Sequence, residues 1–188
     1  MLHFINKKLS NRKTREVMAK QEVLQNRLGP QIQELKAEAK TIMLATVDSM
    51  GTPNISYAPF AINQGEYQVF ISTIARHARN LLENPKVSLM IIEDESKSRQ
   101  IFARRRLSFD ATARVIERHS AEWKDGLAML KARHGKLIDD LATLEDFKLF
   151  SFKPGPGLFV KGFGQAFQVS NDDLVSAVHL DQGHQKEE

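Results

Sequence analysis

Apolar and polar positions between residues 41 and 72 follow the short-period pattern of β-strands. Turn-forming residues separate three apolar runs, Asp48-Ser49-Met50-Gly51 after the first and Gln64-Gly65 after the second. Strands joined by such short turns predict an antiparallel meander. Pro59 favours an edge or a bulge in the second run, because proline has no N–H for a ladder. The three predicted strands are Thr41–Val47, Asn54–Ile62 and Glu66–Ser72.

The rest of the chain mixes helix-type and strand-type segments. Pro85 ends the first helical segment, and His134-Gly135 breaks the second. A tight loop is predicted at Pro154-Gly155-Pro156-Gly157. About six strands with interspersed helices predict a mainly β (α+β) chain that forms a β-barrel with helical insertions. The predicted segments are a helix over 74–85, strands over 87–94 and 101–117, helices over 120–130 and 131–141, and strand structure over 146–170.

The two ends of the chain differ from this middle. Pro30 opens an amphipathic helix that ends near Lys40, with Ile32 and Leu35 on one face. The basic stretch before it favours a solvated or partly disordered arm over a contact with nucleic acid or membrane. We therefore divide the chain into a basic N-terminal arm or helix, a barrel domain and a polar C-terminal tail. Their ranges are 1–22, 23–170 and 171–188.

Composition excludes several kinds of chemistry. The 188 residues include no cysteine, which excludes disulfides, thiolate zinc sites, iron–sulfur clusters and a thiol nucleophile. The net charge of +4 is modest and suits an anionic ligand, and we expect no nucleic-acid or membrane partner. No apolar run approaches the ~20 residues of a membrane span, and the first 20 residues lack the apolar stretch of a secretory signal. A cytoplasmic protein is expected.

Histidine is the most informative residue type for metal binding. No two histidines have the i, i+4 spacing of a helical zinc site, whereas one histidine suffices for haem iron. No phosphate-binding P-loop or nucleophile elbow is present. Gly162-Phe163-Gly164 is too short for a dinucleotide motif and predicts a bulge or a close backbone approach. The histidines are His3, His77, His119, His134, His179 and His184.

Three polar groups have both a structural and a functional interpretation. An alternating strand places Arg104 and Arg106 on one face and Arg105 on the other, which forms either a solvated face or an anion site. Asp146, between a helix and a strand, is typical of a cap or turn residue. The third group is either a phosphate site at a strand-to-helix turn or an N-cap with exposed charges. It comprises Ser72, Thr73, Arg76, His77 and Arg79.

Several segments together resemble the HutZ/HugZ family of haem-utilisation proteins, within the pyridoxamine-phosphate-oxidase-like split-barrel superfamily. The resemblance extends from about Gln21 to Lys186. The helix with Asn84-Pro85 is common to flavin-binding split barrels, whereas the run Phe159–Ala166 and the terminal Gly183-His184 are more specific to the haem branch. The other matching segments are 40–41, 44–48, 54–60, 74–81, 92–94, 102–107 and 157–158.

This resemblance implies a homodimeric, six-stranded antiparallel split barrel with haem at the dimer cleft. It implies a haem-degrading oxidoreductase that opens the porphyrin with O2 and an electron donor and releases iron for iron acquisition. His184 resembles the ligand of the haem iron, although His179 is close enough in sequence to replace it. Asp146 resembles the hydrogen-bond partner of that histidine, and Arg106 a residue beside the haem. Thr41 and His77 resemble residues of the protomer contact around the haem.

Three other functions remain open at this point. One is haem storage or delivery with little turnover. Another is an FMN-dependent oxidoreductase of the parent superfamily, in which Arg76, Arg79 and Ser72 would hold the FMN phosphate. The last is a flavin-free structural dimer.

Overall fold

A computed structural model describes the backbone of residues 2–179 and the side chains of residues 18–19 and 21–175. Helices and strands alternate along it, and two short 3-10 turns, Glu95–Lys97 and Ile101–Ala103, lie between β4 and β5. The elements are α1 Leu2–Glu38, β1 Thr41–Val47, β2 Pro53–Asn63, β3 Glu66–Ser72, α2 Arg76–Glu83, β4 Lys86–Ile92, β5 Arg106–Ile116, α3 Ala121–His134, α4 Leu137–Leu141, β6 Phe147–Gly162, β7 Gln165–Val169 and β8 Val175–His179.

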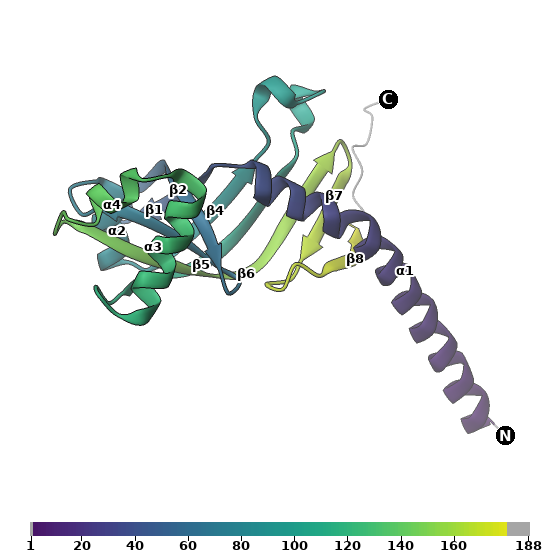
Figure 1. Ribbon diagram of the computed structural model, residues 1–188. Coiled ribbons are helices and arrows are strands. Elements are labelled where there is room, and N and C mark those ends of the chain that lie inside the picture. The colour runs from purple at the N-terminus through teal and green to yellow at the C-terminus, as the bar shows by residue number, and fades with distance from the viewer. Residues whose placement is uncertain (1, 180–188) are drawn as a thin grey trace.

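The strands form one antiparallel sheet that closes into a barrel (Figure 1). Their order is β3-β2-β1-β4-β5-β6-β7-β8, and an additional pairing of β3 with β6 closes the first six strands. The first part of β6, up to Phe152, pairs with β3, whereas Gly157–Gly162 pairs with β7. The predicted six-stranded antiparallel split barrel with helical insertions is therefore confirmed, and β7 and β8 extend it.

The sheet contradicts one prediction about proline and agrees with another. The predicted loop at residues 154–157 is wrong, because these residues lie inside β6. Pro154 pairs with Ala111 and Gly157 with Phe109, so two residues of β6 face one residue of β5 in a bulge. Pro59 lies where β2 changes its partner from β1 to β3, which agrees with the expected edge or bulge.

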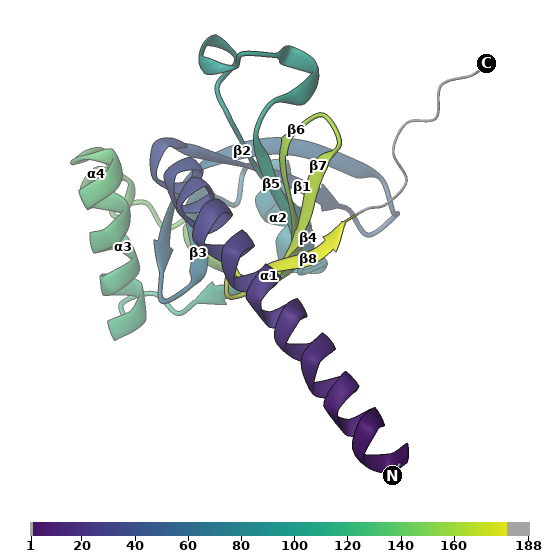
Figure 2. The same ribbon diagram turned by 90° about the vertical axis from the view of Figure 1, so that its right-hand side faces the viewer.

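Helix α1 is longer than the pattern predicted. It is one helix from Leu2 to Glu38 with Pro30 inside it, so the predicted start at Pro30 is wrong and the backbone of the basic arm is helical. Leu28, Ile32 and Leu35 are fully buried against the barrel. Their burial, at about 1.5–3 kcal/mol each, outweighs the ~3 kcal/mol cost of proline in a helix. The N-terminal half of α1 extends away from the barrel (Figure 2).

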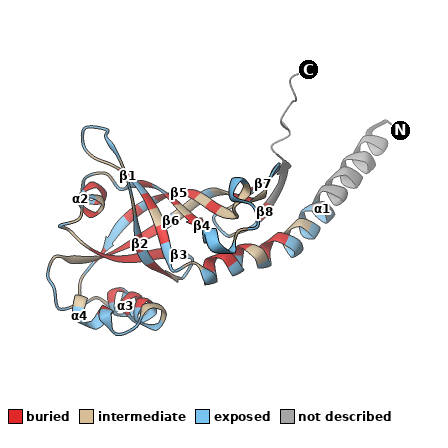
Figure 3. Ribbon diagram, turned by 90° about the horizontal axis from the view of Figure 1, so that it is seen from above, coloured by how far each residue is buried: buried red, intermediate tan, exposed pale blue. Residues whose placement is uncertain are grey.

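Burial divides the interior into two clusters (Figure 3). The larger fills the barrel and the space under α1, with Phe60, Phe150, Phe152 and Phe159 fully buried. The smaller lies under α3, around Trp123 and Leu130. The described residues form no helix long and apolar enough to cross a membrane.

Candidate functional site

Asp146 is held at the start of β6 by the connection between β3 and α2. The Ser72 hydroxyl donates to Asp146 Oδ2 (2.5 Å), and the Thr73 N–H donates to the Asp146 carbonyl (2.8 Å). Ser72 Oγ also accepts a hydrogen bond from the Ile74 N–H (3.0 Å). Asp146 is therefore a turn residue, as its sequence position indicated, and its carboxylate is oriented by Ser72.

The polar group at the β3–α2 connection is engaged in contacts within the chain. The N-cap of α2 is Ala75, whose side chain makes no capping bond, so neither Ser72 nor Thr73 is an N-cap. Arg76 forms an ion pair with Asp48 (3.1 Å), and Arg79 donates to the Ile74 carbonyl. Because Ser72 is also engaged, the three residues expected to hold an FMN phosphate each have a partner close by.

His77 lies on α2 and faces β2. Its Nδ1 shares a hydrogen bond with Ser56 Oγ (2.9 Å), and burial lowers the pKa of its imidazole. The neutral ring is therefore favoured near pH 7. A second bond attaches the same helix to β1, because Asn80 Nδ2 donates to Thr46 Oγ1 (3.0 Å) and both residues are buried.

The three consecutive arginines have different environments. The strand β5 begins only at Arg106, so the expected alternation of all three along one strand is wrong. The Arg104 guanidinium pairs with Glu95 (2.9 Å). The Arg105 guanidinium pairs with three carboxylates, those of Glu93 (2.8 Å), Glu34 (2.7 Å) and, more distantly, Glu38 (3.9 Å).

Arg106 differs from its two neighbours. Its guanidinium bonds to the Arg104 carbonyl (3.4 Å) and, within the described part of the chain, has no carboxylate partner. A half-buried guanidinium without a carboxylate can accept an anion from outside. Of the three arginines, only Arg106 therefore has a positive charge that no carboxylate of the described residues compensates, as the anion-site interpretation requires.

The predicted site residues lie at different ends of the barrel. Thr41 is exposed at the start of β1. The start of β1 lies beside the end of β4, because Met43 pairs with Met90, and the end of β4 pairs with Arg106 of β5. Thr41 and Arg106 are therefore at the same end of the sheet. Asp146 lies at the other end, where Leu149 of β6 pairs with Ile116 of β5. A single protomer therefore does not bring Arg106 and Asp146 together.

The two candidate iron ligands lie at or beyond the C-terminal limit of the described residues. His184 lies outside them. His179 is the last residue of β8 and pairs with Phe167 of β7, so the strand β8 lies within the predicted C-terminal tail. No group of three or more potential metal-ligating side chains occurs among the side chains that the structure describes.

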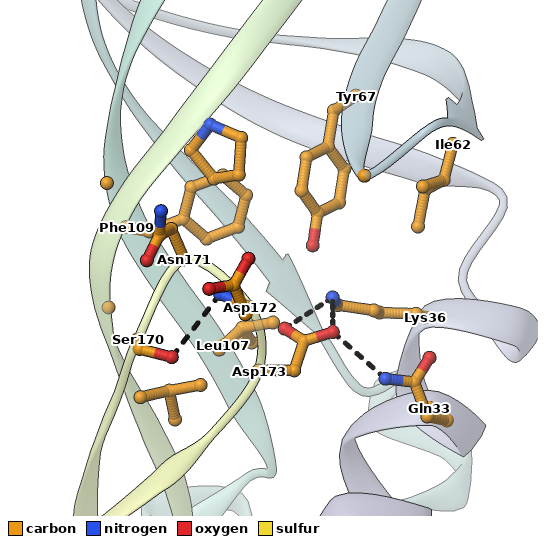
Figure 4. Close-up of a pocket in the computed structure, with 15 residues that line it drawn as sticks. Gln33, Lys36, Ile62, Tyr67, Leu107, Phe109, Ser170, Asn171, Asp172 and Asp173 are labelled. Carbon is orange, nitrogen blue, oxygen red and sulfur yellow. Dashed lines mark hydrogen bonds and ion pairs between the residues drawn. The ribbon is translucent and has the colours of Figure 1, made fainter.

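A pocket of about 360 Å³ lies between the barrel, α1 and the β7–β8 turn (Figure 4). The buried Lys36 ammonium lies 2.5 Å from Asp173, and Gln33 donates to the same carboxylate. Burial, and secondly the charge of Asp173, raises the pKa of the Tyr67 hydroxyl. Sequence reasoning missed this cluster, although Lys36 follows Ile32 by one helical turn and so shares its buried face.

Comparison with known proteins identifies the family. The pyridoxamine 5'-phosphate oxidase family matches residues 28–161, which is more than half of the chain, and the chain belongs to that family. It is also 59% identical over 167 residues to the heme oxygenase HutZ of Vibrio cholerae serotype O1, covering 89% of this chain and 95% of that protein. The chain is thus a close homologue of HutZ, and the resemblance inferred from the sequence is confirmed.

Two solved structures agree with this assignment. HutZ from Vibrio cholerae, a heme storage protein by its description, matches with a TM-score of 0.69 at 56% identity, covering 73% of this chain and 96% of that one. ChuZ from Campylobacter jejuni matches with a TM-score of 0.78 at 28% identity, covering 86% of this chain and 66% of that one.

Proposed function

We propose that this protein binds haem between two copies of the chain and opens the porphyrin ring with O2 and an electron donor, releasing iron. The observation that carries this proposal is the 59% identity to a heme oxygenase over 89% of the chain. In the proposed reaction haem is both ligand and substrate, and its iron supplies the oxygen chemistry. The chain's own residues bind and orient it.

His184 is proposed to bind the iron through one imidazole nitrogen and to donate from the other to Asp146. Such a carboxylate fixes the histidine tautomer and makes the ligand more basic. Arg106, which has no carboxylate partner among the described residues, is proposed to lie beside the haem and pair with a propionate or another anion there. Thr41 and His77 are proposed to form the protomer contact around the site.

The reach of the chain supports a dimeric site. His179 pairs with Phe167 of β7, which in turn pairs with Phe159 of β6. Asp146 lies just before the opposite end of β6. The separation is roughly 40 Å of strand at about 3.3 Å per residue. His184 follows His179 by five residues, which span at most about 18 Å. This difference in reach favours a bond between His184 of one chain and Asp146 of another.

The surface of the barrel also supports a homodimer. On the β1–β2 face, Ile55 and Tyr57 are 64% and 67% exposed, and Ala45 beside Ile55 is exposed as well. Large exposed apolar side chains on a sheet face are typical of a surface that another protein covers. A monomeric mass by light scattering, with or without haem, would contradict the dimer.

A haem titration followed by ascorbate in air tests the proposal. The wild type is expected to give a sharp Soret band that bleaches with ascorbate while Fe(II) appears in a chelator assay. His184→Ala should lose the Soret band, and His179→Ala, the matched control, should keep it. The reverse pattern would assign the ligand to His179, and absence of specific binding by the wild type would refute the proposal.

Storage is the second candidate function, because the HutZ structure that the chain resembles is described as a heme storage protein. Storage and degradation predict the same Soret band and the same effect of His184→Ala. They differ in the ascorbate step: storage predicts bound haem that is reduced but retains its absorbance, with no release of Fe(II).

A further inference from the structure

The strongest unassigned feature is the set of hydrogen bonds around Ser72. Its oxygen accepts from the Ile74 N–H, so the single hydroxyl proton is left to be donated, and it lies 2.5 Å from Asp146 Oδ2. The Thr73 N–H holds the backbone of Asp146 at 2.8 Å. Asp146 Oδ1 has no hydrogen-bond partner among the described residues.

Ser72 is itself held firmly in place. It is the last residue of β3 and pairs with Phe147, the residue after Asp146, in the β3–β6 ladder. The helix that follows is attached to β1 by the buried bond between Asn80 and Thr46. A hydroxyl on a strand end orients a neighbouring carboxylate more precisely than a group on a free loop.

We infer that Ser72 is a positioning residue, which holds Asp146 Oδ2 so that Oδ1 faces the imidazole of the iron-binding histidine contributed by the second chain. This inference rests on the proposed function. Without the Ser72 hydroxyl the Asp146 side chain can rotate, and its bond to the histidine weakens. The iron–histidine bond then changes in the same direction as when Asp146 loses its charge, but to a smaller extent.

The chain contains a matched control for this bond. Ser88 Oγ on β4 donates to Asp110 on β5, another bond from a serine to an aspartate on neighbouring strands. Ser88→Ala removes a serine–aspartate hydrogen bond at an exposed position away from Asp146. Ser72→Thr retains the hydroxyl and serves as the conservative rescue.

The test measures the iron–histidine stretching band of ferrous haem by resonance Raman and the haem reduction potential, with Asp146→Asn as benchmark. Ser72→Ala should lower the band frequency and raise the potential as Asp146→Asn does, by a smaller amount. Ser72→Thr and Ser88→Ala should match the wild type. Each variant should melt well above the temperature of the measurement, which separates positioning from a loss of folding.

The outcomes separate this inference from the proposed function. If Asp146→Asn shifts the band and Ser72→Ala does not, or shifts it the opposite way, only the role of Ser72 is refuted. If Asp146→Asn has no effect, or the wild type binds no haem, the proposed role of Asp146 is refuted and that of Ser72 with it.

Discussion

Lys36 of α1 and Asp173 of the β7–β8 turn form an ion pair, with Nζ 2.6 and 2.5 Å from the two carboxylate oxygens. Lys36 is only 7% exposed. Gln25, three turns earlier on the helix, donates to the Asp173 carbonyl (3.2 Å) and accepts from the Val175 N–H (2.7 Å). These contacts fix the start of β8 to α1, and so fix the strand from which the C-terminal segment continues.

Replacing Lys36 with methionine should therefore destabilise the fold. The change leaves the Asp173 carboxylate with only Gln33 as a side-chain partner among the described residues. We expect a loss of about 1–3 kcal/mol in the free energy of unfolding, measured with urea. Lys97→Met is the control, because Lys97 and Glu38 are exposed and 3.8 Å apart; it should cost at most about 0.5 kcal/mol. Equal losses would contradict a special role of the buried pair.

Asn80→Ala should be similarly costly, because it leaves the buried Thr46 hydroxyl without its donor. We expect a loss of about 1–3 kcal/mol. The double variant Asn80→Ala/Thr46→Val should lose less than the sum of the single variants, since no polar group is then left unpaired. Urea unfolding of the four proteins measures this coupling, and strictly additive losses would exclude it.

Acid stability should depend on Glu66. Burial raises the pKa of Glu66, but hydrogen bonds from Ser151 (2.6 Å) and Arg114 (2.7 Å) lower it more, so the net pKa lies below the ordinary 4.5. As the pH falls, Glu66 of the unfolded chain therefore binds a proton at a higher pH than Glu66 of the folded chain. The stabilisation that the Glu66 carboxylate gives the fold is present above pH 4.5 and is lost below it. Glu66→Gln should flatten the decline of melting temperature below about pH 4.5.

The exposed Glu145 provides the control for this measurement. Glu145→Gln should retain the wild-type decline of melting temperature with falling pH. If Glu66→Gln retained it as well, the stabilisation of the Glu66 carboxylate by Ser151 and Arg114 would be refuted.

The bulge in β6 makes Gly157 hard to replace. A Cβ at this position would lie 2.7 Å from the Ser108 carbonyl oxygen, which is backbone and cannot move freely. Gly157→Ala should therefore cost about 1–3 kcal/mol. Gly162→Ala, in the same strand, is the matched control, because its nearest neighbour would be a side-chain atom of Gln165 at 3.9 Å. Thermal melting of both variants tests the difference.

The sequence predicted strands well where apolar runs end at clear turns. Thr41–Val47 and Glu66–Ser72 are strands with the predicted bounds. It failed where tertiary packing overrides a local signal: Pro30 lies inside α1, and residues 154–157 lie inside β6. In both cases contacts with distant residues, the barrel core or β5, decide the backbone conformation.

The candidate site shows the same limit. The residues that resemble haem-site residues were found from the sequence, but their partners were not, because Ser72 is 74 residues away from Asp146 in the chain. Alternation along a strand could not reveal that, among the described residues, Arg104 and Arg105 pair with carboxylates while Arg106 does not. Such pairings depend on the turns of the chain before Arg106, which carry no periodic signal.

The difference between the arginines yields a final prediction about haem. Arg106→Gln removes a guanidinium that has no carboxylate partner in the described part of the chain, so it should change the free energy of unfolding by at most about 0.5 kcal/mol. Arg105→Gln removes three ion pairs, with Glu93, Glu34 and Glu38, and should reduce stability more. Haem affinity should show the opposite order.

We therefore expect Arg106→Gln to weaken haem binding or slow ascorbate-driven bleaching by about tenfold or more, as for the loss of one charge-assisted hydrogen bond of 1.5–3 kcal/mol. Arg105→Gln should leave both close to the wild type at a temperature where it is folded. Haem titrations and urea unfolding of the two variants test both halves of this prediction. A variant Arg106→Gln that binds and bleaches haem as the wild type does would exclude this arginine from the site.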